Sequence, residues 1–293
     1  GEILNSREMT AETGYQYMPP VYGDGMIFVA QGGGAVEAFN ADTLEPLWRY
    51  VDPLGGQCRS QMRYADGYVY AGYFNSPNSN SNWVCLSATD EDPTKGNEKK
   101  LATWTMAHKS GFYFAGCYTS DKYVFITSDG GNGAYEGTLY CLDKENGYVL
   151  QKIPVQGDIR GNVVYYENRL FLTTTKGYVY AFNLNDEGMI DTENTIEPLY
   201  LGGRSTNTPV IFNNRLYFSC AAGSVGPYPD AGIYVVDINP DTGAMSLAYQ
   251  VKAAGNCQGS GIISTAEFDS TGYVYVYFTA NTSDGSIYMI KDK

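Results

Sequence analysis

"NNRLYFSC" (residues 213–220) and "GIYVVDINPDTG" (residues 232–243) are the two segments of the sequence that decide the fold. In the first, a polar Asn-Asn turn precedes a short apolar run; in the second, a similar run precedes a turn rich in Asp, Asn and Gly. Such residues favour tight turns, and runs rich in Tyr, Val, Ile and Phe are typical of strands. The pair therefore predicts two consecutive β-strands with turns at their ends.

The same pair of segments recurs along the whole chain. The last turn residue before the first strand repeats at intervals of roughly 42 to 57 residues, near the length of a propeller blade. The anchoring turn residues are Gly25, Gly67, Lys122, Arg169, Arg215 and Gly272. The repeat predicts an all-β fold, a six-bladed β-propeller of four-stranded antiparallel blades, in a single domain that spans residues 1–293.

Each repeat has room for an inner strand before the quoted pair, such as "TPVIF" (residues 208–212), and for an outer strand after it, such as "SLAYQV" (residues 246–251). The last repeat ends at Lys293 without an outer strand, and an unpaired blade edge would expose backbone amides and carbonyls. We expect the N-terminal segment from Ile3 to Met9 to close the ring. A frayed N-terminus beside a three-stranded last blade is the alternative.

A column of small or flexible residues recurs at one position of the second strand, which predicts close packing between successive sheets. Its members are Ala38, Cys85, Cys141, Ala181, Val235 and Met289. The six cysteines include no C-x-x-C pair, so we expect them to be free thiols packed as small apolar groups. A reactive thiol or a disulfide at Cys58 and Cys257 is the alternative.

Charge and motif content exclude several classes of function. The net charge of −13 argues against a nucleic-acid partner and disfavours an anionic membrane surface, and no apolar run is long enough to span a bilayer. A single histidine argues against a histidine-based triad or a transition-metal site. The residues from Asp237 resemble the start of a calcium loop, but Thr242 and Ala248 stand where an EF-hand needs Gly and Glu. We therefore expect a turn there, and no metal or cofactor.

"GIYVVDINPDTG", "GTLYCLDKENG" (residues 137–147) and "AFNADTLEPLW", which ends at Trp48, resemble the repeat of quinoprotein-like (PQQ-like) propellers over essentially the whole chain. Members that use the quinone typically have eight blades and adjacent cysteines, whereas this chain has six repeats and no Cys-Cys. Other members are non-catalytic envelope or secreted scaffolds, including one that assists outer-membrane protein assembly. The resemblance implies a non-catalytic binding or scaffold module, secreted or displayed on a bacterial cell surface.

The segments that lead into the inner strands carry the candidate binding residues. They read "GGQCRSQ", "AHKSGF", "QGDIRGN", "GGRSTNT" and "GNCQGSG". They predict a ring at the channel mouth made of Arg59, His108, Lys109, Arg160, Arg204 and Gln258. Guanidinium groups bind carboxylates or phosphates bidentately, so the ring suggests a site for a small anionic ligand, a glycan or a protein partner. The alternative is that each Arg braces neighbouring blades through backbone carbonyls or a partner such as Asp158.

Four polar insertions and several loop tyrosines offer further binding surfaces. The insertions are residues 74–82, 90–100, 128–137 and 220–232, and the tyrosines are Tyr113, Tyr135 and Tyr228. Neither G-x-S-x-G nor a P-loop occurs, so the sequence offers little for an enzyme. The alternative function is a glycan-active hydrolase or lyase that draws carboxylates from different blades into the central channel.

Overall fold

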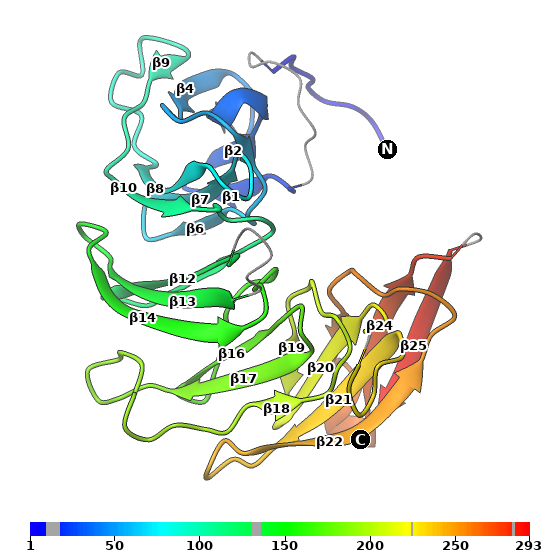
Figure 1. The fold of residues 1–293 in the computed structure, drawn as a ribbon. Coiled ribbons are helices and arrows are strands. Elements are labelled where there is room, and N and C mark those ends of the chain that lie inside the picture. The colour runs from blue at the N-terminus through cyan, green and yellow to red at the C-terminus, as the bar shows by residue number, and fades with distance from the viewer. Residues whose placement is uncertain (10–17, 131–135, 224, 283–284) are drawn as a thin grey trace. The chain divides into compact units, whose positions relative to one another are not determined.

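The computed structural model describes residues 1–9, 18–130, 136–223, 225–282 and 285–293. The fold is all-β: these residues form six β-sheets, with one 3₁₀ turn η1 (Gly32–Gly34) and one short helix α1 (Phe268–Thr271) (Figure 1). Nowhere in these ranges does a helix have the length and apolar character needed to cross a membrane. The chain divides into two compact units: the first unit is Gly1–Ala134 with Leu142–Leu150, and the second unit is Tyr135–Cys141 with Gln151–Lys293.

The first unit contains two complete sheets. The first sheet has the order β1-β2-β3-β4-β9, in which only the β4–β9 pair is parallel. Its strands are β1 (Val21–Gly23), β2 (Met26–Ala30), β3 (Ala35–Asn40), β4 (Pro46–Val51) and β9 (Glu98–Lys99). The second sheet has the order β10-β8-β7-β5, with β6 also paired to β7. Its strands are β5 (Gln57–Cys58), β6 (Arg63–Ala65), β7 (Tyr68–Phe74), β8 (Asn80–Ser87) and β10 (Trp104–Lys109).

The third, fourth and fifth sheets each have four strands in chain order. The third consists of β11 (Cys117–Thr119), β12 (Tyr123–Ser128), β13 (Glu136–Asp143) and β14 (Val149–Gln156). The fourth consists of β15 (Val164–Tyr166), β16 (Arg169–Thr173), β17 (Tyr178–Asn183) and β18 (Leu199–Tyr200). The fifth consists of β19 (Val210–Phe212), β20 (Arg215–Cys220), β21 (Gly232–Ile238) and β22 (Met245–Lys252). The sixth has three: β23 (Ile262–Ser264), β24 (Val274–Ala280) and β25 (Ser286–Asp292).

The predicted order of strands within a repeat is confirmed. The quoted pair forms β20 and β21, which are antiparallel with Arg215 opposite Asp237 and Cys220 opposite Gly232. The predicted inner and outer strands are β19 and β22, and they flank that pair. The turn after β21 is confirmed as well, because the Asn239 side chain accepts hydrogen bonds from the amides of Asp241 and Thr242, both at 3.0 Å. Asn and Asp hold many such turns through their side chains.

The fifth sheet shows how the core forms. Successive side chains of a strand point to opposite faces. On β20, Leu216 and Phe218 pack with Phe171 of the fourth sheet. Tyr217, between them, packs with Phe278 of the sixth. Both faces of this sheet are therefore buried, and successive sheets of the second unit stack face to face as propeller blades do.

The predicted column of small residues holds in five of its six positions. Ala38, Cys85, Cys141, Ala181 and Val235 are buried between packed faces. Met289 is 60% exposed, so the prediction is wrong at the last repeat. There the register aligns Ile262, Tyr277 and Met289 on one face of the sixth sheet, and that face is exposed.

The predicted closure of the ring by the N-terminal segment is not confirmed. Residues 1–9 form no strand, Ile3 and Leu4 are more than 80% exposed, and the sixth sheet has three strands in the described part of the chain. Polar contacts hold the segment on the first sheet instead: Arg7 pairs with Glu45, and the Asn5 amide donates to the Asp42 carbonyl at 2.8 Å. Residues 10–17, which follow this segment in the chain, lie outside the described residues.

The cysteines behave as the sequence predicts. All six are free thiols, and all six are buried. Burial raises the pKa of the Cys58, Cys85, Cys117 and Cys141 thiols to about 12, which disfavours the reactive thiolate. These side chains therefore serve as small apolar packing groups.

Candidate functional site

Chain direction brings several loops of the second unit to one end of its sheets. The strands of the fourth sheet alternate in direction, so the start of β15, the β16–β17 turn and the end of β18 share one end. Lys176 lies in that turn, and Gly202 follows β18. By the same rule, Arg204, which precedes β19, lies at the same end of the fifth sheet as the β20–β21 loop.

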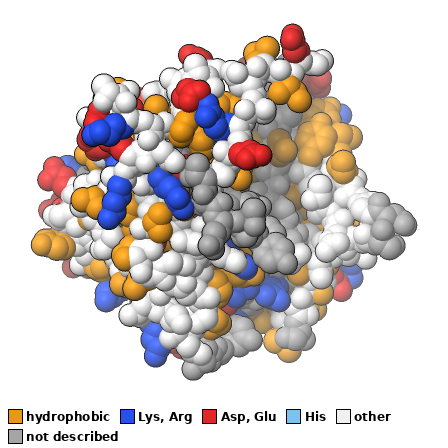
Figure 2. All heavy atoms as spheres, turned by 90° about the horizontal axis from the view of Figure 1, so that it is seen from above, with side chains coloured by type: hydrophobic (Ala, Val, Ile, Leu, Met, Phe, Trp, Pro, Cys, Tyr) orange, Lys and Arg blue, Asp and Glu red, His pale blue; other side chains and the backbone are white. Residues whose placement is uncertain are grey.

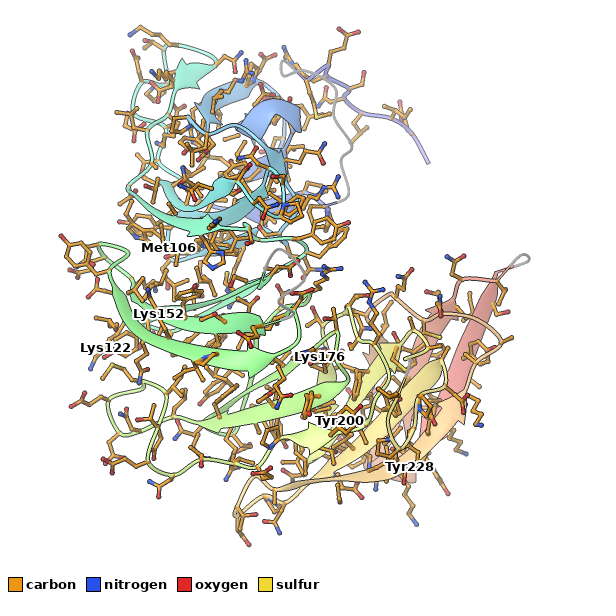
Figure 3. All side chains as sticks on the ribbon, in the orientation of Figure 1. Met106, Lys122, Lys152, Lys176, Tyr200 and Tyr228 are labelled. Carbon is orange, nitrogen blue, oxygen red and sulfur yellow. The ribbon has the colours of Figure 1, made fainter. Side chains whose placement is uncertain are left out.

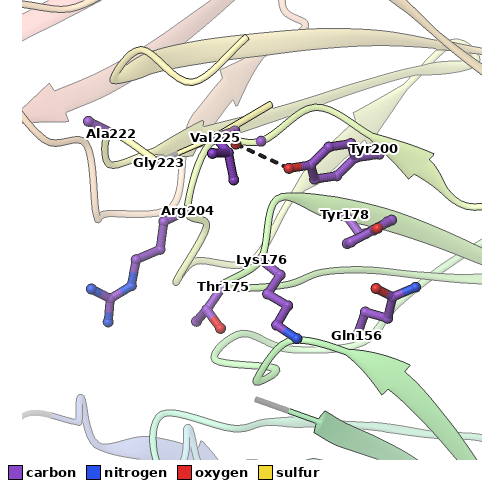
Figure 4. A pocket seen from close by; sticks show the side chains of 10 residues that line it. Gln156, Thr175, Lys176, Tyr178, Tyr200, Arg204, Ala222, Gly223 and Val225 are labelled. Carbon is purple, nitrogen blue, oxygen red and sulfur yellow. Dashed lines mark hydrogen bonds between the residues drawn. The ribbon is translucent and has the colours of Figure 1, made fainter. Parts of the chain in front are cut away.

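These loops enclose a pocket with a volume of about 720 Å³. Residues that line it include Lys176, Tyr178, Tyr200, Arg204, Gly223 and Val225 (Figure 4). Gly223 and Val225 belong to the insertion 220–232, which the sequence marks as a candidate binding loop. This volume lies within the range of about 300–1,000 Å³ found for small-molecule sites.

A pair of tyrosines forms one wall of the pocket. Tyr178 on β17 stands opposite Tyr200 on β18, and their ring centroids are 4.7 Å apart. The Tyr200 hydroxyl donates to the Val225 carbonyl at 3.1 Å. That hydrogen bond ties the β20–β21 loop to the sheet and fixes the Tyr200 ring in place.

Two glycines allow the loops to come this close. Gly177 has φ +85° and Gly202 has φ +100°, and the Gly177 carbonyl accepts hydrogen bonds from the amides of Leu201 and Gly202 at 2.8 and 3.1 Å. A Cβ on Gly177 would lie 2.5 Å from the Cα of Gly202, well inside van der Waals contact. Only Gly meets both demands without strain, so these residues set the shape of the pocket between Lys176 and Gly202.

The three arginines that the sequence aligns differ in their surroundings. The Arg59 Nε donates to Gln57 at 2.7 Å, and Arg160 pairs with Asp158 at 3.1 Å. In both cases the partner lies two residues earlier, on the same side of an extended chain. The equivalent position before Arg204 is Gly202, which has no side chain. Among the described residues, the exposed Arg204 guanidinium has neither a hydrogen bond nor an ion pair.

The pocket is a local positive site on an acidic protein. It is lined by Arg204 and Lys176 and, within the part of the chain that the structure describes, by no Asp or Glu. Figure 2 shows acidic, basic and hydrophobic side chains interspersed on one face of the protein. A cationic concavity in such a surface concentrates field lines and attracts anions.

Arg160 has an ion-pair partner in Asp158, which yields a testable contrast with Arg204. Asp158 is buried, so Arg160→Ala removes the cation beside a carboxylate shielded from water and is expected to cost about 1–2 kcal/mol of unfolding free energy. Arg204→Ala is expected to change that free energy by less than about 0.5 kcal/mol, because the side chain is exposed. Urea unfolding of the two variants measures both values. Equal losses of unfolding free energy in the two variants would contradict the difference between the paired Arg160 and the exposed Arg204.

Arg59, His108 and Lys109 belong to the first unit. The Arg59 guanidinium lies 5.1 Å from the centroid of the Tyr113 ring, and the His108 ring lies 5.7 Å from that of Phe112. Lys109 is exposed at the end of β10. The segment 111–114 thus gathers Arg59 and His108 around aromatic rings, a packing role that the sequence did not predict.

The other predicted binding residues lie apart from the pocket. Gln258 is exposed between β22 and β23 and does not line it, and the ring of six residues stays a prediction. Tyr228 is 42% exposed on the insertion 220–232, where its amide donates to the Leu201 carbonyl at 2.9 Å. Tyr135 and half of the insertion 128–137, residues 131–135, lie outside the described residues.

Comparisons with known proteins agree with the architecture. A family model described as outer membrane protein assembly factor BamB matches residues 86–281. No curated protein sequence matches the chain.

Many solved structures have a similar fold, and three of them illustrate it. BamB from Moraxella catarrhalis has a TM-score of 0.58 at 15% identity, covering 94% of this chain and 76% of that one. A functionally unknown protein from Desulfotomaculum acetoxidans DSM 771 has a TM-score of 0.56 at 14% identity, covering 88% and 76%. A chain of the mitotic checkpoint complex has a TM-score of 0.59 at 10% identity, covering 92% and 72%. At these identities the likeness shows the fold alone.

Proposed function

Since the chain belongs to the family of outer membrane protein assembly factor BamB, we propose that it is a non-catalytic binding or scaffold protein. The match over residues 86–281, more than half of the chain, is the observation that carries the proposal. Rigid stacked sheets support it, because such a scaffold leaves the loops free to carry binding residues.

The partner-binding surface in this proposal is the loop end of the second unit. Val225 is 70% exposed, and the partly exposed Tyr228 lies three residues further along the same insertion. Exposed apolar side chains beside a pocket are typical of interaction surfaces, and Tyr is enriched in them. A protein partner would contact these side chains.

The experiment that tests this function separates binding from catalysis. Tagged protein is purified from its source cells, and the same preparation is incubated with glycans whose products are analysed. We expect one protein to co-purify in near-equal amount and no glycan to be cleaved. Cleavage by the purified protein, with no partner recovered, would establish the glycan-active alternative instead.

The proposed setting is the exterior of a bacterial cell, either secreted or on the surface. The support is the description of the family, which names the outer membrane. Fractionation of source cells tests it, and recovery of the protein in the cytoplasmic fraction would contradict it.

The proposed assembly is a closed ring of six blades, completed by the N-terminal segment. The support is the sixfold repeat and the exposed apolar row Ile262, Tyr277 and Met289, which a closed ring would cover. Deletion of residues 1–9 is expected to lower the melting temperature by about 5 °C, since it removes a blade strand. Differential scanning calorimetry measures the shift.

The control for this deletion removes only the contacts seen on the first sheet. The double variant Asn5→Ala with Arg7→Ala loses the exposed bonds to Asp42 and Glu45, which contribute less than about 1 kcal/mol. A deletion that shifts the melting temperature no more than the double variant would contradict ring closure by this segment.

A further inference from the structure

The pocket at the loop end of the second unit has a chemistry that suits a small ligand, independent of any protein partner. We propose that it binds a compound in which a six-membered ring carries one carboxylate, as in sugar acids and aromatic acids. The proposal rests on the charge, the flat wall and the size of the pocket.

The charge of the pocket specifies an anionic group. The Arg204 guanidinium is exposed and has no side-chain or backbone partner in the described ranges, so its donors are available to a ligand. A guanidinium binds a carboxylate through two parallel hydrogen bonds, and Lys176 adds a second positive charge to the lining. The described lining contains no Asp or Glu that would repel the anion.

The wall of the pocket specifies a ring. Tyr178 and Tyr200 lie on the opposite side from Arg204 in Figure 4, and Tyr200 is held by its hydrogen bond to Val225. A fixed aromatic ring presents a flat apolar face with little conformational entropy to lose on binding. A ligand ring can pack on this wall while its carboxylate reaches Arg204.

The size of the pocket argues against an isolated ion. A volume of about 720 Å³ far exceeds that of a phosphate or acetate ion, and it fits one or two rings. Gln156 also lines the pocket, and its amide carries both donors and an acceptor. That group can bind a ring hydroxyl, which a sugar acid and a hydroxylated aromatic acid both carry.

Protein-observed NMR titration tests the proposal on the full chain. The acid probes are galacturonate and 4-hydroxybenzoate; their neutral counterparts are galactose and 4-hydroxybenzyl alcohol; acetate and phosphate are the free-ion probes. We expect one acid to bind in the millimolar range or more tightly, at least tenfold better than its neutral counterpart and than either ion. Which acid binds identifies the source of the ring.

Two variants with the same change of charge complete the test. Arg204→Gln is expected to weaken binding of that acid at least tenfold. Lys152→Gln, on β14 and apart from Lys176 and Tyr200 (Figure 3), is expected to change it less than twofold. Binding of neither acid, equal binding of a neutral counterpart or of phosphate, or equal loss in both variants would overturn the proposal. A requirement for an acidic peptide in place of either acid would overturn it too.

Discussion

Replacing Gly177 by Ala is expected to lower the unfolding free energy by about 3 kcal/mol, the sum of backbone strain and overpacking. Gly177 has φ +85°, where L side chains are strained. Its added Cβ would also meet the backbone of Gly202 at 2.5–2.6 Å, and backbone cannot move aside as a flexible side chain does. Urea unfolding measures the loss, which should be accompanied by a distorted pocket.

Gly272→Ala is the matched control in the same unit. Gly272 has φ +71°, but a Cβ there meets nothing within 4 Å, so this variant measures the backbone strain alone, about 1 kcal/mol. The difference between the two variants is the cost of pushing the β16–β17 turn away from Gly202. Equal losses would show that the close approach of the loops contributes nothing.

Asp292→Ala is expected to cost about 2 kcal/mol, because it breaks a network that joins the fifth and sixth sheets. The Asp292 carboxylate on β25 accepts two hydrogen bonds from Arg215 at 2.9 and 3.0 Å and one from the Tyr217 hydroxyl at 2.7 Å. Arg215 also pairs with Asp237 at 2.7 Å. Asp269→Ala, an exposed change in α1, is the control and should change stability by less than about 0.5 kcal/mol.

The same network predicts a pH dependence. Burial raises the pKa of Asp292, but hydrogen bonds from Tyr217, Arg215 and Tyr249 outweigh it, so the pKa lies below its ordinary value of 3.8. The folded state then favours the ionised carboxylate, and its stabilisation is complete above pH 3.8 and lost as the pH falls below it. The stability difference between wild type and Asp292→Ala should therefore shrink in that acidic range. A difference that stays constant on acidification would contradict this account.

The strands were predictable because their signals are local. The turns before β20 and after β21 carry Asn, Asp and Gly, and the mostly apolar runs between them match strands that are buried at nearly every position. Pairing between neighbouring strands then follows from the short connections. No distant residue is needed to predict either feature.

The sequence repeat did not predict which face of each sheet is covered by a neighbouring sheet. Val235 and Met289 occupy the same position in two repeats, yet one is buried and the other is 60% exposed. The difference depends on what packs against each face, which is a tertiary property. Ring closure by the N-terminal segment depends on tertiary contacts in the same way: its apolar residues fit a strand, but its polar contacts lie on the first sheet.

Arg204 could have been distinguished from the other arginines by its sequence neighbours, but the predicted ring of six residues grouped them together. Arg59 and Arg160 each follow a side-chain acceptor by two residues, whereas Arg204 follows Gly202, so the sequence already distinguishes the arginine without such a partner. Lys176 lies in a hairpin turn that chain direction places at the same end of the sheets as Arg204. Tyr178 and Tyr200 could not be assigned to the pocket from the sequence. The long loop 184–198 joins β17 and β18, and its length does not show which residues of the two strands lie opposite each other.

Site-specific photo-crosslinking in source cells tests the binding role of the loop end most directly. A benzoylphenylalanine replaces Tyr228 in one variant and Tyr165, of nearly equal exposure at 44% on β15, in another. We expect a discrete crosslinked partner from position 228 and none from position 165. Absence of a product at position 228, or the same products from both positions, would contradict it.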